Sequence, residues 1–128
     1  MYIALICVLI AGLMPFAWTA VAKIAGPRYD NRDVRNWQSR LSGLPHRANA
    51  AHLNSFEAFP LFAASVLAAL LTGADAQRTM YLAIAFVVLR LAYGVVYLLD
   101  IAALRSLVWF AAIGCSVAIF AGALSAIA

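Results

Sequence analysis

The residues best suited to chemistry lie at the start of an apolar run, Ala48 to Thr72. The first turns of this run carry four groups that a lipid bilayer disfavours: Asn49, His52, Asn54 and Glu57. An ionisable side chain inside a membrane span costs about 3 kcal/mol or more, so such a residue usually has a function and a partner. This segment is therefore the first candidate for a binding or catalytic site.

The next apolar run carries a second set of polar residues on one helix face. At 100° per residue, its members fall within an arc of about 80°. They are Arg90, Tyr93, Tyr97 and Asp100. A similar arc of the preceding run holds Arg47, Asn54 and Glu57. Two antiparallel helices joined by a short turn would bring these two faces together.

The spacing on these faces predicts which residues meet. Glu57 lies ten residues in from Arg47. Arg90 lies ten residues in from Asp100. In antiparallel helices the Arg47 end of one helix and the Asp100 end of the other lie on the same side of the membrane. Glu57 and Arg90 would therefore both lie about 15 Å in from that side. In antiparallel register we expect Glu57 to meet Arg90, and Arg47 to meet Asp100.

The expected pair of Glu57 and Arg90 has two interpretations. It can be a buried strut that fixes the register of two helices. It can instead form the floor of a polar pocket that opens to one side of the membrane. The same register brings Asn54 to Tyr93, with Tyr97 one turn nearer the mouth. These groups favour the pocket, because a strut needs no further hydrogen-bonding groups above it.

Arg105 begins the last apolar run, close to the expected mouth of this pocket. One interpretation is an anchor whose charged end reaches the membrane surface. The other is a guanidinium beside a cleft, which would be well suited to hold an anion.

Other residues with chemical potential have structural interpretations. Asn49 and His52 point away from the polar face, toward another helix or another subunit, and we expect His52 to be hydrogen-bonded structure. No second His or Cys lies at metal-ligand spacing, so no metal site is predicted. Cys7 and Cys115 lie in different apolar runs and are interpreted as small buried hydrophobes.

The composition defines the elements that must position these residues. Of 128 residues, 66% are hydrophobic and 11% are charged. Soluble domains average about 45–50% apolar and about 25% charged residues, so the chain is an integral membrane protein. Its apolar runs are too long for barrel strands, which leaves helices as the spanning elements. The predicted fold is an all-α four-helix bundle forming one domain, residues 1–128.

Each predicted helix is long enough to cross a hydrocarbon core of about 30 Å. The four helices cover approximately residues 1–24, 48–73, 78–99 and 105–127. Pro15 should kink the first helix. Residues 25–47 form a polar loop, in which Trp37 and Leu41 favour a short helix lying at the lipid headgroups.

Basic residues gather on one side of this predicted bundle. The segment Lys23–Arg47 and the connection before the last helix carry seven Lys or Arg when Arg105 is counted. Only Arg78 lies near the opposite side. The positive-inside rule therefore places both loops in the cytoplasm and both termini outside. The sequence pI of about 9.5 is explained by this orientation, so no nucleic-acid partner is predicted.

Three patterns together resemble the MAPEG family, the membrane-associated proteins of eicosanoid and glutathione metabolism. The first is Ala51-His52-Leu53-Asn54-x-x-Glu57-x-x-Pro60. The second is Arg90-x-x-Tyr93-x-x-x-Tyr97, and the third is Arg105 at the start of the last helix. The resemblance spans the whole chain in the same four-helix order. Its compact form resembles the bacterial branch, which implies the bacterial inner membrane.

The resemblance implies a left-handed bundle that assembles as a homotrimer, with glutathione as co-substrate in three sites between neighbouring subunits. Asn54 and Glu57 would hold the amino-acid end of glutathione, and Tyr93 and Tyr97 would line its pocket above Arg90. Arg105 would stabilise the thiolate as the catalytic residue.

Further contacts to glutathione follow from the same resemblance. Lys23 or Arg28 would contact its carboxylates from the next subunit. An arginine that the family places four residues before the asparagine falls here on Ala50. Arg47, one turn earlier, is its possible substitute.

Three functions are compatible with these features. The leading one is a membrane-bound glutathione transferase or peroxidase acting on lipophilic electrophiles dissolved among membrane lipids. The alternative is a non-catalytic lipid-binding or scaffold member of the family. Ala50 in the place of the arginine would fit this alternative, because it would weaken glutathione binding. A small proton-coupled exporter using Glu57 is the third, and the expected permanent partner in Arg90 speaks against it.

Overall fold

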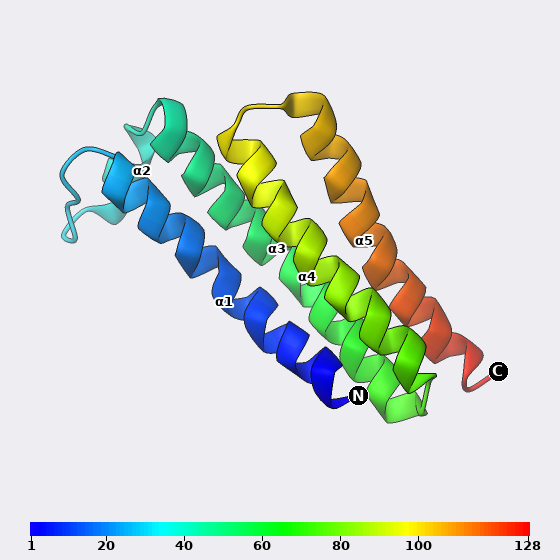
Figure 1. Ribbon diagram of the computed structural model, residues 1–128. Helices are drawn as coiled ribbons and strands as arrows, with labels where there is room; N and C mark the ends of the chain where they lie inside the picture. Colours follow the sequence, from blue (N-terminus) through cyan, green and yellow to red (C-terminus); the bar gives the residue numbers. More distant parts are fainter.

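The computed structural model describes residues 1–128 and consists of five helices joined by short connections. Figure 1 shows the long helices running lengthwise beside one another, with both chain termini at the same end. The helices are α1 (Tyr2–Ala25), α2 (Val34–Ser39), α3 (Gly43–Thr72), α4 (Ala76–Leu98) and α5 (Ala102–Ser125). The all-α four-helix fold predicted from the sequence is confirmed.

Four of these helices, α1, α3, α4 and α5, are long and apolar enough to cross a membrane. The short helix α2 was expected near Trp37 and lies beside the end of α1 (Figure 1). Asp33 caps its N-terminus by accepting a hydrogen bond from the backbone N–H of Asn36. The chain is therefore an integral, multi-pass membrane protein.

Two helix boundaries differ from the sequence prediction. Helix α3 begins at Gly43 rather than near residue 48, so the polar loop shortens to residues 26–42. Pro45 lies in the first turn of α3, where its missing N–H costs no helical hydrogen bond, so it starts the helix rather than delaying it. Helix α5 begins at Ala102, which places Arg105 within its first turn.

The connections fix the antiparallel path of the chain. Gly73 ends α3 with a φ of 69°, a left-handed conformation that glycine adopts without strain. Two residues later, Asp75 caps α4 by accepting from the backbone N–H of Arg78 at 2.8 Å. This tight turn makes α3 and α4 antiparallel neighbours, as the polar spacing requires.

All four long helices contribute to the hydrophobic core, and α1 and α5 pack on the α3–α4 pair from opposite sides (Figure 1). Phe62 of α3 stacks on Phe86 of α4, with ring centroids 3.8 Å apart. Trp18 of α1 fits against Gly94 of α4, where a β-carbon would overlap its indole ring. The pair of α3 and α4 carries most of the polar residues that the sequence predicts on facing arcs. We call this set the polar ladder; it consists of Arg47, Asn54, Glu57, Arg90, Tyr93, Tyr97 and Asp100.

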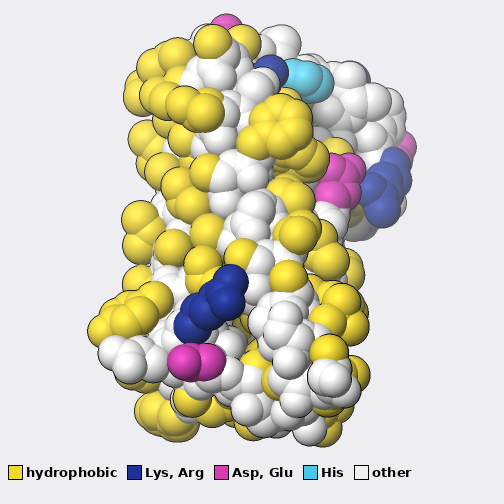
Figure 2. Space-filling view, turned by 90° about the vertical axis from the view of Figure 1, so that its right-hand side faces the viewer, with side chains coloured by type: hydrophobic (Ala, Val, Ile, Leu, Met, Phe, Trp, Pro, Cys, Tyr) yellow, Lys and Arg dark blue, Asp and Glu magenta, His cyan; other side chains and the backbone are white.

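Much of the surface is apolar. Figure 2 shows hydrophobic side chains spread over much of the face at the α5 side, with a few charged groups among them. Only 22% of the residues in the most apolar 18-residue stretch of α5 are buried inside the chain. Such a surface is suited to contact with lipid tails or with other membrane helices.

Candidate functional site

Arg90 is the centre of the polar ladder. Its side chain is 2% exposed, although it carries a guanidinium. One terminal nitrogen, Nη2, donates to Asn54 Oδ1 on α3 at 3.0 Å. Its Cζ lies 4.4 Å from the centroid of the Tyr93 ring. The other terminal nitrogen, Nη1, is buried without a hydrogen-bond partner.

The expected ion pair between Glu57 and Arg90 is not formed, and the prediction of that contact was wrong. Asn54 stands between the two groups, because it accepts from Arg90 and its Nδ2 donates to Glu57 Oε2 at 3.1 Å. The Glu57 side chain is exposed on the chain surface. An amide can accept and donate at once, so Asn54 links the two charges without burying the carboxylate.

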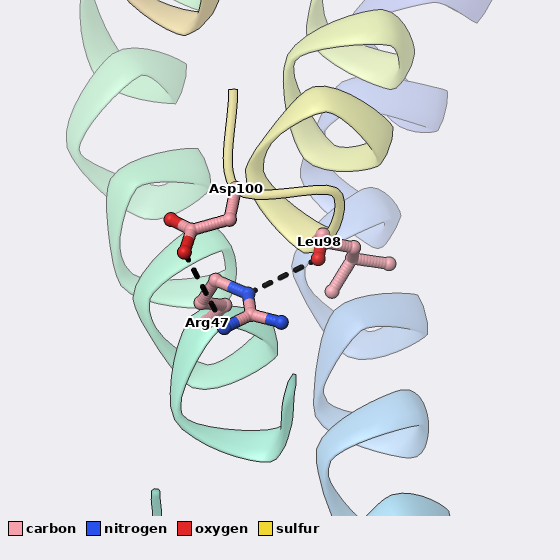
Figure 3. Close-up of polar contacts among 3 residues, drawn as sticks. All are labelled: Arg47, Leu98 and Asp100. Atoms are coloured by element: carbon pink, nitrogen blue, oxygen red, sulfur yellow. Dashed lines mark hydrogen bonds and ion pairs between the residues drawn. The ribbon is translucent and has the colours of Figure 1, made fainter. Parts of the chain in front are cut away.

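The expected contact between Arg47 and Asp100 is formed. Arg47 Nη1 lies 3.7 Å from Asp100 Oδ2 (Figure 3). Arg47 Nε also donates to the backbone carbonyl of Leu98 at 3.1 Å, at the end of α4 (Figure 3). These contacts hold the start of α3 against the end of α4, at one end of the polar ladder.

Arg105 joins the ladder from α5. Its Cζ lies 4.4 Å from the centroid of the Tyr97 ring. The Tyr97 ring in turn meets Tyr93 edge to face, with centroids 5.6 Å apart. A cation over an aromatic face is attracted to it, so Tyr97 holds the guanidinium beside α4. Arg105 therefore belongs to the same polar assembly as Arg90.

A cavity of about 170 Å³ lies where α3, α4 and α5 meet. Its polar lining comes from Asn54, Tyr93, Arg105 and Ser106. Its apolar lining comes from Trp109 and Phe110, whose rings meet edge to face at 5.0 Å. We call this cavity the recess. It brings together three of the residues predicted from the sequence to form a pocket, one from each helix.

Sequence reasoning missed the apolar half of the recess. The pocket predicted from the sequence includes none of Ser106, Trp109 and Phe110. The available signal was the spacing on the last helix, because Trp109 follows Arg105 by four residues and so shares its face.

Lys23 and Arg28 lie outside the recess. The Lys23 ammonium lies 3.8 Å from the centroid of the Tyr29 ring, at the end of α1. Arg28 follows in the loop and is exposed. Their expected contact with glutathione bound to a neighbouring subunit stays a prediction.

His52 faces α1, away from the recess. Its Nδ1 lies 2.8 Å from Thr19 Oγ1 and 3.0 Å from the carbonyl oxygen of Pro15. The ring also meets Phe56 edge to face. His52 therefore ties α3 to the proline-containing turn of α1, which confirms its expected structural part.

The fold and the recess define a class: a multi-pass helical membrane protein with a mixed polar and aromatic recess near one end of the bundle. Residues 3–125 match the sequence model of the MAPEG family. The chain belongs to this family, which includes glutathione transferases and also non-catalytic members. Searches of curated proteins and of solved structures found no significant match.

Proposed function

We propose that the protein is a membrane-bound glutathione transferase, or glutathione-dependent peroxidase, acting on lipophilic electrophiles. The observation that carries the proposal is the recess, where an arginine, three other polar residues able to hydrogen-bond and the rings of Trp109 and Phe110 line one space. Such a space can receive a charged thiol from one side and an apolar substrate from the other. Membership of a family that generally uses glutathione supports this assignment.

The polar wall fits the amino-acid end of glutathione. Asn54 lines the recess and is linked to Glu57, a carboxylate that suits an ammonium group. Arg90 Nη1 is a buried donor without a partner, and such a group favours an acceptor or a water molecule beside it. Arg47, paired with Asp100, lies at the end of the same face and is proposed as a further contact.

Arg105 is proposed to stabilise the thiolate. A free thiol has a pKa of about 8.5, and only the thiolate is a strong nucleophile. Lowering this pKa by about two units requires about 2.7 kcal/mol of preferential stabilisation of the thiolate. One partly desolvated guanidinium can supply this amount through a charge-assisted hydrogen bond. The electrophile would then meet the sulfur from the side of Trp109 and Phe110.

A neighbouring subunit is proposed to complete the site. Pockets for small molecules usually have about 300–1,000 Å³, and the recess of about 170 Å³ is smaller than this. Glu57, on the surface of a single chain, would then lie between subunits of a homotrimer. Lys23 and Arg28 of the adjacent chain would contact the carboxylates of glutathione.

The proposed location is the bacterial inner membrane, with the polar loop and Arg105 on the cytoplasmic side. The basic residues support it, because they gather at one end of the bundle while both termini lie at the other (Figure 1). Glutathione would then enter from the cytoplasm.

Replacing Arg105 tests the function. We expect Arg105→Ala to lower the rate of glutathione conjugation to a lipophilic electrophile at least about tenfold, because the thiolate loses its counter-charge. The matched control is Arg78→Ala, which removes an exposed arginine at the other end of the bundle. Unchanged turnover in Arg105→Ala would remove this residue from the mechanism.

The second candidate is a non-catalytic lipid-binding or scaffold protein, which is favoured by Ala50 in the place of an arginine. Glutathione at millimolar concentration should raise the melting temperature of the transferase and leave that of the scaffold unchanged. The exporter is not favoured. Glu57 would be the proton carrier, and it has no ion pair with Arg90 that would prevent this. However, its carboxylate accepts a hydrogen bond from Asn54 and lines no cavity through which a substrate could pass.

A further inference from the structure

The loop of residues 26–42 is the most basic part of the molecule, and the proposed chemistry leaves most of its charge unexplained. Four arginines and two aspartates lie in it. They are Arg28, Arg32, Arg35, Arg40, Asp30 and Asp33. Figure 1 shows this loop beside the end of α1, with α5 on the other side of the central helices. In a single chain it is therefore separate from the recess.

The loop is held in a fixed shape by an aromatic anchor. Trp37 is 3% exposed and packs with Ala22, Leu41 and Ala48. Its indole Nε1 donates to the carbonyl of Pro27 at 3.0 Å. The backbone of the loop is thereby fixed on the ends of α1 and α3, so a site built on it is formed before any ligand arrives.

The two aspartates do not neutralise the arginines. Asp30 Oδ1 accepts from the backbone N–H of Arg32 at 2.9 Å. Asp33 accepts from the backbone N–H of Asn36. The chain contains one ion pair, between Arg47 and Asp100, and it lies outside this loop. The guanidinium groups of the loop therefore keep their positive charge without a carboxylate partner.

Three of these arginines surround one concave space of about 460 Å³. Its lining consists of Arg28, Tyr29, Asp30, Arg32 and Arg40. We call this space the arginine cradle. Three positive charges against one negative charge leave it with a net charge of +2. Its chemistry is that of an anion site with several guanidinium forks, which match the geometry of phosphate oxygens.

The cradle lies where lipid headgroups lie. Helix α1 has 24 residues and so spans about 36 Å, slightly more than a hydrocarbon core of about 30 Å. The loop that follows it is therefore at headgroup depth, and Trp37 and Tyr29 are residues typical of that layer. Basic clusters at this depth attract anionic lipids of the adjoining leaflet.

We propose that the arginine cradle binds the headgroup of an anionic phospholipid, with the phosphate held by Arg32 and Arg40. The lipid is favoured over a free anion because its tails extend into the leaflet beside α1, where exposed apolar side chains such as Ile24 are available. This inference does not depend on the proposed transferase activity.

Binding of phosphatidylglycerol to the detergent-purified protein, measured by native mass spectrometry, tests the proposal. We expect Arg32→Gln/Arg40→Gln to weaken this binding at least about tenfold. The matched control, Arg35→Gln/Arg78→Gln, removes the same charge from exposed positions outside the cradle and should change binding less than about twofold. Both variants alter exposed side chains, so the fold should persist.

Competitors distinguish the lipid from other anions. Phosphatidylcholine and inorganic phosphate should fail to displace phosphatidylglycerol at equal concentration. Equal weakening in the two double variants would overturn the proposal in favour of general charge attraction. Displacement by inorganic phosphate would overturn it in favour of a simple anion site. Displacement by glutathione would overturn it by assigning the cradle to the thiol site.

Discussion

Asn54 is the residue on which the polar assembly depends most. It accepts a hydrogen bond from Arg90 and donates one to Glu57, so one neutral side chain connects a buried cation with an exposed carboxylate. Arg90 Nη1 already lacks a partner. The guanidinium is therefore held in the core by one side-chain hydrogen bond and by the face of the Tyr93 ring.

Removing this amide should destabilise the protein. We expect Asn54→Ala to lower the free energy of unfolding by about 1–3 kcal/mol, because a buried charged donor loses its acceptor. The measurement is chemical or thermal unfolding in detergent. Asn49→Ala is the matched control, since Asn49 lies on the same helix and makes no side-chain hydrogen bond to the rest of the protein. Equal losses of unfolding free energy in the two variants would contradict the role of Asn54 as a bridge between Arg90 and Glu57.

At the scale of elements, the position of α1 against α4 is set by one close contact. Trp18 lies over Gly94, and the space that a β-carbon would need is filled by the indole ring. The side chain of Trp18 is 7% exposed, so the ring is buried between the helices. This contact fixes the distance between α1, which leads into the loop of the arginine cradle, and α4, which carries Tyr93 and Tyr97.

Adding one methyl group at this contact should separate the helices. We expect Gly94→Ala to cost at least about 1–3 kcal/mol of stability, because the methyl group overlaps a rigid ring. The double variant Gly94→Ala/Trp18→Leu should recover part of this loss, since the smaller side chain leaves room. The melting temperatures of the single and double variants measure this coupling. If the stability losses of Gly94→Ala and Trp18→Leu, each measured alone, simply add in the double variant, the contact does not set the distance between α1 and α4.

The elements could be predicted from the sequence more completely than the contacts between them. Four long apolar runs leave little choice of fold, and Arg47 and Asp100 are at helix ends, where a register is easy to infer. Glu57 and Asn54 are three residues apart on one arc, so helical periodicity could not decide which of them faces Arg90. The aromatic wall was missed because Trp109 also suits the membrane interface. The cradle depends on how Trp37 folds the loop, which no periodic pattern encodes.

At the scale of the whole molecule, the recess and the basic end of α1 lie on different sides of a single chain. A homotrimer would bring Lys23 and Arg28 of one subunit to Arg105 of the next. Mixed assemblies test this arrangement without a structure of the complex. One chain carries Arg105→Ala, and the other carries Lys23→Ala/Arg28→Ala.

Each of these chains alone should conjugate glutathione much more slowly than the wild-type protein. When both are co-expressed and mix at random, about a quarter of the sites between subunits should contain all the unchanged residues. We therefore expect about a quarter of the wild-type turnover per site. Mixed assemblies that recover no activity would place all these residues in the same subunit's site. Full activity of either chain alone would place its changed residues outside the site.

The central claim is that the recess holds glutathione as a thiolate beside Arg105. The ultraviolet absorbance of the thiolate, recorded while glutathione is added to the detergent-purified protein near pH 7, tests it most directly. We expect a saturable thiolate signal in the wild-type protein at a pH below the ordinary thiol pKa of about 8.5, and its loss in Arg105→Ala. Saturating glutathione that gives no thiolate absorbance with the wild-type protein would contradict the claim.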